Sequence, residues 1–171
     1  MGLRGERREN PSRKFQMREK MFAIGDDYWI EDEQGQRAFK VNGKALRLRQ
    51  TFVLEDASGA ELATIREKKL AIRDTMKIEI GKREAKVHKR TFGIRDRFIV
   101  ELDEGDDYAA KGNFVDHEYE IERDGSKVAE VSKKWFRVRD TYGVEVFGEQ
   151  DLAMVLAITV CIDSLSHDRA G

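Results

Sequence analysis

An internal repeat is the feature of this sequence that most limits how the chain can fold. KLAIRDTMKIEI (Lys69–Ile80) and WFRVRDTYGVEV (Trp135–Val146) match closely, ALRLRQTFVL (Ala45–Leu54) and GIRDRFIVEL (Gly93–Leu102) follow the same pattern, and two weaker copies fill the gaps. Each copy begins with an aliphatic residue, at Ile24, Leu48, Ile72, Ile94, Val115 and Val138. Nearly constant spacing indicates one supersecondary unit used six times.

Within each unit, apolar residues alternate with mostly polar ones. The fourth residue after the aliphatic start is large and apolar, and the sixth is aliphatic, as in Phe98 and Val100. This period of two predicts strands with one face on a core and the other in water. Turn signals such as Ala57-Ser58-Gly59 and Asp124-Gly125 follow, each before another alternating run. Each unit is therefore predicted to be a β-hairpin.

Six hairpins give about twelve strands, a number at which a twisted antiparallel sheet tends to close and so remove its exposed edges. The last segment is different, because DLAMVLAITVCIDSL (Asp151–Leu165) is apolar on nearly every side and carries no charge from Leu152 to Ile162. That uncharged stretch would span roughly 16 Å as a helix, about half of a bilayer's hydrocarbon core. A barrel of this size needs filling. We therefore expect a closed antiparallel β-barrel of about twelve strands around a buried C-terminal helix.

Composition sets further limits. The 171 residues suit one domain, and the formal net charge of −1 gives no overall signature of a nucleic-acid binder, so no nucleic-acid partner is expected. A single cysteine, Cys161, excludes a disulfide framework and fits the cytoplasm. Residues 1–14 lack an apolar pattern and are expected to form a disordered lead, with 15–171 as the barrel domain.

The arrangement resembles the Tubby C-terminal-like superfamily, which includes the Tubby proteins, the phospholipid scramblases and the LURP-one-related family. The last is the nearest match, over Phe15–His167, through the KLAIRDTMKIEI and WFRVRDTYGVEV strands, the Gly112-Asn113-Phe114 segment and the terminal helix. The resemblance implies the barrel and its central helix, whereas it implies no biochemical activity. Tubby domains bind phosphoinositide headgroups, and scramblases carry cysteine clusters, but neither feature maps onto this chain residue by residue.

The densest basic stretch supplies the main candidate binding residues. Lys86, His88 and Arg90 alternate with Ala85 and Val87, so in a strand they project from one face. They fit either a site for a phosphorylated headgroup or nucleic-acid phosphates, or a solvated strand that resists edge pairing.

Lys68 and Lys134 occupy equivalent places in the two best-matched units and join this candidate anion-binding set. Arginines also recur at one point of four units, and three are followed by aspartate, which favours an architectural role over an anion site. These arginines are Arg49, Arg73, Arg95 and Arg139.

Other residues suggest no chemistry. The acidic run Asp103–Asp107 lacks the spacing of an EF-hand and is read as a solvated turn, and the three histidines lack metal-ligand spacing. The sequence contains no nucleophile elbow, phosphate loop or HExxH motif, and Cys161 is expected to be buried and unreactive. We therefore expect no catalytic residue, no metal and no cofactor.

Three functions remain open. The first is a non-enzymatic binding module, cytoplasmic or peripheral at the membrane, whose basic surface recognises anionic phospholipid headgroups. The second is a scaffold for an unidentified protein, with no lipid ligand. The third, lipid scrambling, requires the terminal helix to leave the barrel and uncover its apolar surface. Sequence gives no oligomeric state, and no transmembrane segment is expected.

Overall fold

The computed structural model describes residues 11–19, 27–46, 49–70, 73–136 and 138–167. Within them the chain forms twelve strands and one C-terminal helix, α2 (Leu152–His167). The strands are β1 (Ser12–Arg18), β2 (Tyr28–Asp32), β3 (Arg37–Leu46), β4 (Arg49–Asp56), β5 (Glu61–Leu70), β6 (Arg73–Ile80), β7 (Arg83–Phe92), β8 (Arg95–Leu102), β9 (Tyr108–Asn113), β10 (Glu118–Arg123), β11 (Ser126–Ser132) and β12 (Thr141–Phe147).

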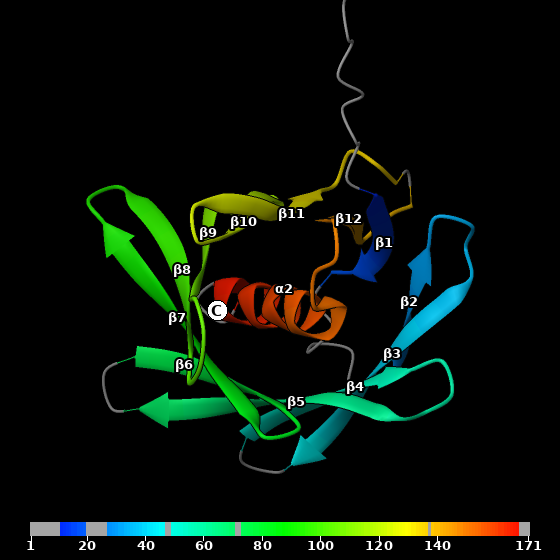
Figure 1. Ribbon diagram of the computed structural model, residues 1–171, viewed down its shortest axis with the longest axis horizontal. Helices are drawn as coiled ribbons and strands as arrows, with labels where there is room; N and C mark the ends of the chain where they lie inside the picture. The colour runs from blue at the N-terminus through cyan, green and yellow to red at the C-terminus, as the bar shows by residue number, and fades with distance from the viewer. Residues whose placement is uncertain (1–10, 20–26, 47–48, 71–72, 137, 168–171) are drawn as a thin grey trace, which may run out of the picture.

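The strands form one closed antiparallel barrel in which each strand pairs with its sequence neighbours. β1 closes the ring, pairing with β12 from Ser12 to Arg18 and with β2 at Phe15 and Gln16. The ring encloses α2 (Figure 1). The predicted fold, a twelve-stranded barrel of six hairpins around a C-terminal helix, is confirmed.

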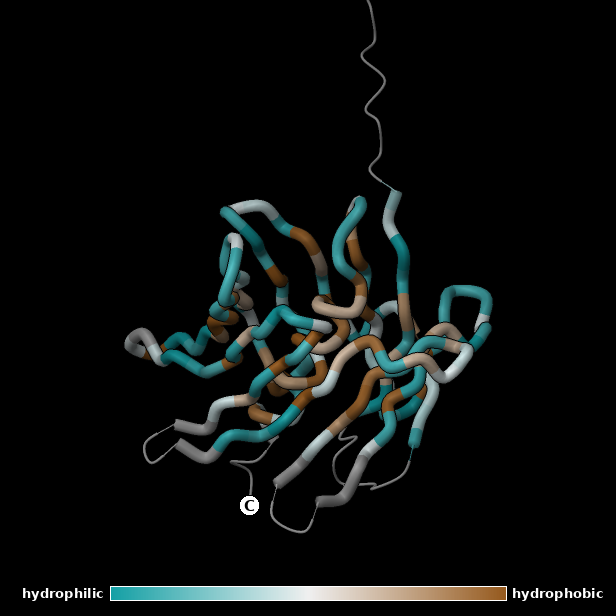
Figure 2. Tube along the Cα trace, turned by 60° about the horizontal axis from the view of Figure 1, so that its bottom comes forward, coloured by the Kyte–Doolittle hydropathy of each residue, from teal (hydrophilic) through white to brown (hydrophobic). Residues whose placement is uncertain are grey.

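The alternating apolar residues of the repeat line the interior, as predicted. In every unit, the large apolar residue four positions after the aliphatic start is at most 7% exposed. The aliphatic residue two positions later is fully buried. Figure 2 shows hydrophobic segments in the middle of the molecule and hydrophilic ones at most hairpin ends. The large apolar residues are Tyr28, Phe52, Met76, Phe98, Tyr119 and Tyr142, and the aliphatic residues are Ile30, Leu54, Ile78, Val100, Ile121 and Val144.

Helix α2 fills the barrel. Residues from Met154 to Leu165 are all buried, and the helix packs against β5, β6, β7 and β12. Asp151 caps its first turn, because its side-chain Oδ1 accepts a hydrogen bond from the Met154 N–H and its carbonyl accepts one from the Val155 N–H. No helix in the described residues has the length and hydropathy needed to cross a bilayer.

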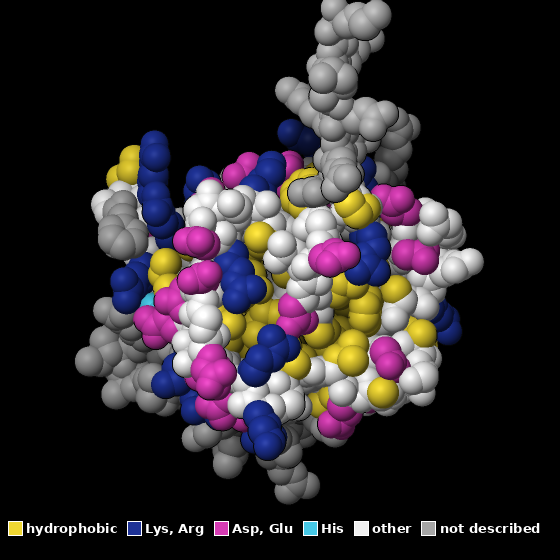
Figure 3. Space-filling model, in the orientation of Figure 1, with side chains coloured by type: hydrophobic (Ala, Val, Ile, Leu, Met, Phe, Trp, Pro, Cys, Tyr) yellow, Lys and Arg dark blue, Asp and Glu magenta, His cyan; other side chains and the backbone are white. Residues whose placement is uncertain are grey.

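The barrel has two ends. The six connections β1–β2, β3–β4 and so on to β11–β12 lie at one end, which we call the tip end. The turns within the predicted hairpin units, such as β4–β5 and β10–β11, and the β12–α2 connection lie at the other, which we call the polar end. Figure 3 shows charged side chains of both signs around a central area of apolar side chains on one face.

The aliphatic residue that starts each repeat does not enter the core at the described tips. Ile94 is 101% exposed, Val115 67% and Val138 56%. They lie on connections, where no neighbouring strand covers them, and not within a paired strand. The equivalent Ile24, Leu48 and Ile72 lie outside the described residues.

The first strand of the barrel starts at Ser12. From the sequence, the barrel domain is expected to start at Phe15. Ser12, Arg13 and Lys14 pair with β12, and the Ser12 Oγ donates a hydrogen bond to Glu145. Polar residues on the outer side of a closing strand leave no apolar pattern by which a sequence could reveal the strand's start.

Candidate functional site

The outer wall of β5–β7 carries the main group of cations. Arg66 is paired with Lys77, and Lys77 with Lys86, so three cations lie directly opposite one another across three neighbouring strands. Adjacent strands are about 4.8 Å apart, and like charges directly opposite destabilise a sheet. We call this wall the basic face; its cations are Arg66, Lys68, Lys77, Lys86 and Arg90.

The predicted basic stretch lies on this wall with its expected alternation. Ala85 and Val87 face the core, and Lys86 and Arg90 are exposed. His88 is only 7% exposed, because it is covered by neighbours: the Arg90 Nε donates a hydrogen bond to the His88 Nε2 over 3.3 Å. His88 therefore offers little surface to a ligand.

The two additional candidate lysines are separated by the fold. Lys68 on β5 is opposite Thr75, which is opposite His88, so Lys68 belongs to the basic face. Lys134 is exposed on the β11–β12 connection, four strands around the barrel from β7. The structure brings Lys68, Lys86, His88 and Arg90 together and leaves Lys134 apart.

Carboxylates neutralise only part of the basic face. Lys77 Nζ lies 2.8 Å from Glu84 and 2.9 Å from Glu79. Its hydrogen bonds to Glu84 and then Glu79 raise the pKa of Lys77, and its hydrogen bond lowers the pKa of the Glu79 carboxyl. Arg90 is 3.8 Å from Glu101.

By contrast, Arg66, Lys68 and Lys86 make no ion pair among the described residues. Glu79 still interacts electrostatically with Arg66 and Lys68, and Lys86 is opposite Glu101 across β7–β8. Three cations on one open wall are thus available to a ligand. An anion bound between them would also offset the repulsion that the register imposes.

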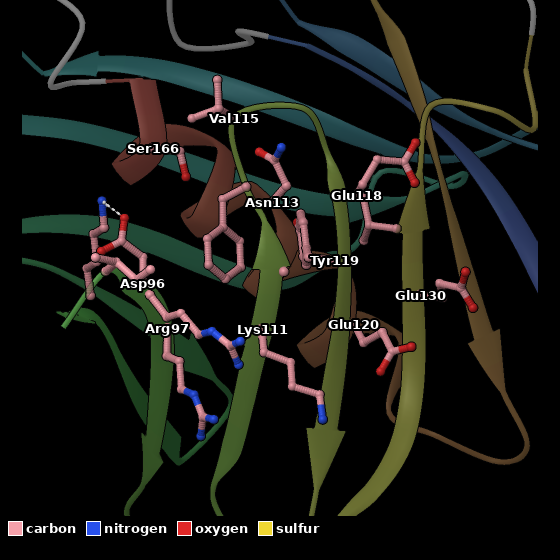
Figure 4. Close-up of a pocket in the computed structure, with 16 residues that line it drawn as sticks. Asp96, Arg97, Lys111, Asn113, Val115, Glu118, Tyr119, Glu120, Glu130 and Ser166 are labelled. Carbon is pink, nitrogen blue, oxygen red and sulfur yellow. Dashed lines mark ion pairs between the residues drawn. The ribbon is translucent and has the colours of Figure 1, made fainter. Parts of the chain in front are cut away.

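A groove with a volume of about 780 Å³ lies over β8–β11. It exists because β8 and β9 separate towards the tip end: only Arg97–Val100 of β8 pair with β9. In Figure 4, Arg97 and Lys111 stand on one side of the groove and Glu120 and Glu130 on the other. The groove's cations are Lys89, Arg95, Arg97 and Lys111, and its carboxylates are Asp96, Glu118, Glu120 and Glu130.

Because cations and carboxylates are equal in number, this groove has no net attraction for an anion. Several of these charges are also paired: Lys89 lies 2.8 Å from Asp96 within the groove. Outside its lining, Glu122 pairs with Lys111 at 2.6 Å, and Lys127 reaches both Glu120 and Glu130. The groove is thus a weaker candidate for an anionic ligand than the open basic face.

A buried polar cluster sits inside the barrel near the tip end. His117 Nε2 and Asp163 Oδ1 are 2.7 Å apart, and both residues are at most 2% exposed. His117 also stacks on Tyr142, with ring centroids 4.4 Å apart. Neither of the two grooves described is lined by His117 or Asp163, so the pair ties the β9–β10 turn to α2 and has no described route to a substrate.

Three tyrosines surround this cluster. Among the described residues, the hydroxyls of Tyr28, Tyr119 and Tyr142 have no hydrogen-bond partner. Burial raises the pKa of all three phenols, and the Asp163 carboxylate raises each further. Burial likewise raises the pKa of the Cys161 thiol, which makes a thiolate unfavourable there.

Sequence reasoning missed the Asp163–His117 pair. A signal was present, because Asp163 is an acid at the end of an otherwise uncharged apolar helix, and a buried carboxylate needs a partner. Which of the three histidines pairs with Asp163 could be decided only from the tertiary structure.

No group of three potential metal ligands occurs in the described part of the chain. The acidic run is exposed, and its carboxylates accept backbone hydrogen bonds, from Leu102 to Asp107 and from Glu104 to Asp103. Of the repeated arginines, Arg95 and Arg139 are exposed, while the side chains of Arg49 and Arg73 lie outside the described part.

Comparison with known proteins agrees with this architecture. The sequence pattern of the family described as LURP-one-related matches residues 13–163. A protein from Arabidopsis thaliana with an X-ray structure superposes with a TM-score of 0.61 at 18% identity, over 92% of this chain and 93% of that one. No curated protein sequence matches the chain. The family pattern, extending over nearly the whole barrel, shows that this chain belongs to the LURP-one-related family.

Proposed function

We propose that this LURP-one-related protein is a non-enzymatic binding module, peripheral to the cytoplasmic surface of a membrane, whose basic face recognises anionic phospholipid headgroups. The observation that carries the proposal is the row Arg66–Lys77–Lys86, in which cations are directly opposite across β5, β6 and β7. Opposed like charges cost stability in the free protein, a cost that Glu79 and Glu84 offset only in part because among the described residues they pair with Lys77 alone. A bound phosphate would turn that repulsion into attraction.

The shape of the basic face favours a lipid surface over a small free anion. The cations lie on the outside of a convex barrel wall, and neither described groove is lined by Arg66, Lys68 or Lys86. An open surface holds one free phosphate weakly. A bilayer presents many headgroups at once, so several weak contacts add through a high local concentration.

The burial of α2 argues against scrambling. Residues from Met154 to Leu165 are buried, so moving the helix into a bilayer would expose the barrel interior. The protein scaffold remains the alternative to lipid recognition, and the experiment below separates the two.

The test is vesicle co-sedimentation with neutral phosphatidylcholine and with added phosphatidylserine, at low and high salt. We expect salt-sensitive binding to the anionic vesicles only. A triple variant, Arg66→Ser with Lys68→Ser and Lys86→Ser, breaks no described ion pair. At about 1 kcal/mol per cation near an anionic surface, it should bind roughly 100-fold more weakly.

The matched control removes three exposed cations elsewhere that make no described ion pair, with Arg13→Ser, Arg18→Ser and Arg37→Ser. Its net charge changes by the same amount, so equal weakening in both triples would mean that general charge, and not the basic face, drives binding. A wild-type protein that binds no vesicle would end the lipid proposal and leave the protein scaffold.

A further inference from the structure

Three large hydrophobic side chains are exposed in the described part of the chain, and all three lie at the tip end. They are Ile94 on the β7–β8 connection, Val115 on β9–β10 and Val138 on β11–β12. Scattered exposed aliphatics are normal on a protein surface. Aliphatics at the same repeat position, at one end of a barrel, are not scattered.

The turns hold these side chains outward. Gly93, at a φ of 62°, lets the chain reverse just before Ile94. The β9–β10 turn is fixed on both sides of Val115: the Asn113 amide donates to Asp116 over 2.7 Å, and His117 is anchored to Asp163. The exposed side chains therefore stand on ordered turns, so little order needs to be gained on binding.

Ile94 and Val115 also share one region. Both line the groove over β8–β11, so they form its rim from two different hairpins. In Figure 4, Val115 and Ser166 lie at one end of this groove, and charged side chains such as Arg97, Lys111 and Glu120 lie farther along the strands. Val138 borders a different groove, with Met17 and Tyr28.

Charge distinguishes the two ends of the barrel. The described turns of the polar end carry many exposed acids. Among the residues of these described turns, Lys82 is the one cation. At the tip end, exposed Arg90 and Arg95 lie on either side of Ile94 in sequence, and exposed Asp116 follows Val115. An anionic surface would therefore repel the polar end more strongly than the tip end around Ile94. The exposed acids of the polar end are Glu33, Asp103, Glu104, Asp106, Asp107, Asp124 and Glu149.

We propose that Ile94 and Val115 penetrate an anionic bilayer, with the barrel leaning towards β7 so that the basic face also meets the headgroups. This deepens the proposed function and rests on it. Arg90 precedes Gly93 by three residues, about 10 Å of strand, so its guanidinium reaches headgroup depth when Ile94 enters the acyl region. Two separate apolar protrusions beside cations suit a fluid layer, whereas a protein partner usually requires one contiguous apolar patch.

The test places an environment-sensitive fluorophore on single introduced cysteines. Buried Cys161 has a raised pKa and should not react in the folded protein. Labels at Ile94→Cys and Val115→Cys should shift to the blue on phosphatidylserine vesicles and be quenched by acyl-chain nitroxides. A label at Val138→Cys should change much less, and one at Gln34→Cys on the polar end should not change.

A second measurement uses unlabelled protein. The double variant Ile94→Ser with Val115→Ser should lose at least about tenfold in vesicle affinity, since it removes the apolar contact with the acyl layer. Val138→Ser is the matched control and should bind as the wild type does. Unchanged melting temperatures would confirm that exposed serines leave the fold intact.

The outcomes separate the two proposals. Salt-sensitive vesicle binding with unshifted labels at 94 and 115, and with wild-type affinity in the double variant, would overturn penetration and leave headgroup recognition standing. Equal shifts at 94, 115 and 138 would overturn the leaning orientation. A wild-type protein that binds no vesicle would overturn both.

Discussion

Asp163, near the end of α2, is hydrogen-bonded to His117 in the β9–β10 turn across 2.7 Å, with both side chains buried. This contact joins the helix inside the barrel to the hairpin that carries Val115. A buried acid is costly without a partner, so the pair fixes the end of α2 against this one turn.

Asp163→Ala should destabilise the protein by roughly 3 kcal/mol, because it removes the carboxylate that is hydrogen-bonded to the buried His117. Asp163→Asn keeps a polar atom in reach and should cost less. Urea unfolding followed by circular dichroism would measure both. A double-mutant cycle with His117→Ala would give the coupling energy. An Asp163→Ala protein as stable as the wild type would mean that the pair does not hold the helix.

Stability should fall steeply at alkaline pH. The pKa values of Tyr28, Tyr119 and Tyr142 are raised by burial in the folded state. Folding therefore keeps protons that the unfolded chain releases above pH 10.0, the ordinary phenol pKa. Stability from these groups is intact below that pH and is lost above it, by up to about 1.4 kcal/mol per pH unit for each tyrosine.

Urea titrations on both sides of pH 10 would measure this slope. Tyr142→Phe is the matched variant, because it removes one ionisable hydroxyl that has no hydrogen-bond partner among the described residues. It should reduce the alkaline slope by one proton and change stability at pH 7 by less than about 1 kcal/mol. An unchanged slope would show that Tyr142 does not stay protonated in the fold.

Gly112→Ala should be strongly destabilising. Gly112 has a φ of 139°, and an added Cβ would lie 2.6 Å from the Glu118 carbonyl oxygen and 2.7 Å from the Tyr119 Cα. Relief requires moving the backbone of β10, so we expect a loss of about 3 kcal/mol or more.

Gly35→Ala is the control for backbone conformation alone. Gly35 also has a positive φ, 73°, but nothing lies within 4 Å of the added Cβ. This variant should lose about 1 kcal/mol. Similar losses in both variants, measured by thermal unfolding, would argue against the close contact at Gly112.

Leu156→Asp should abolish folding. Leu156 is fully buried on α2, and an unpaired carboxylate there has no route to water. Leu156→Met keeps the volume and should cost less than about 1.5 kcal/mol. A soluble Leu156→Asp protein with a cooperative melting transition would contradict the placement of α2 inside the barrel.

Sequence periodicity was enough to predict the barrel because each unit repeats the same physical requirement. Tyr142 and Val144 must be buried for the same reason as Phe98 and Val100, so six copies reinforce one interpretation. The uncharged helix could be placed by length alone. The start of β1 could not be predicted, since Ser12 belongs to the sheet only through its pairing with β12.

The sequence by itself determined the repeat, the strand count and the apolar helix, because periodicity and length are properties of the chain alone. Only the tertiary structure decided which charges meet. Barrel register set Arg66 beside Lys77 and Lys86, moved Lys134 four strands away, joined His117 to Asp163 and left Ile94 and Val115 exposed at one rim. Such contacts depend on strand pairing and closure across residues far apart in sequence, which local pattern does not specify.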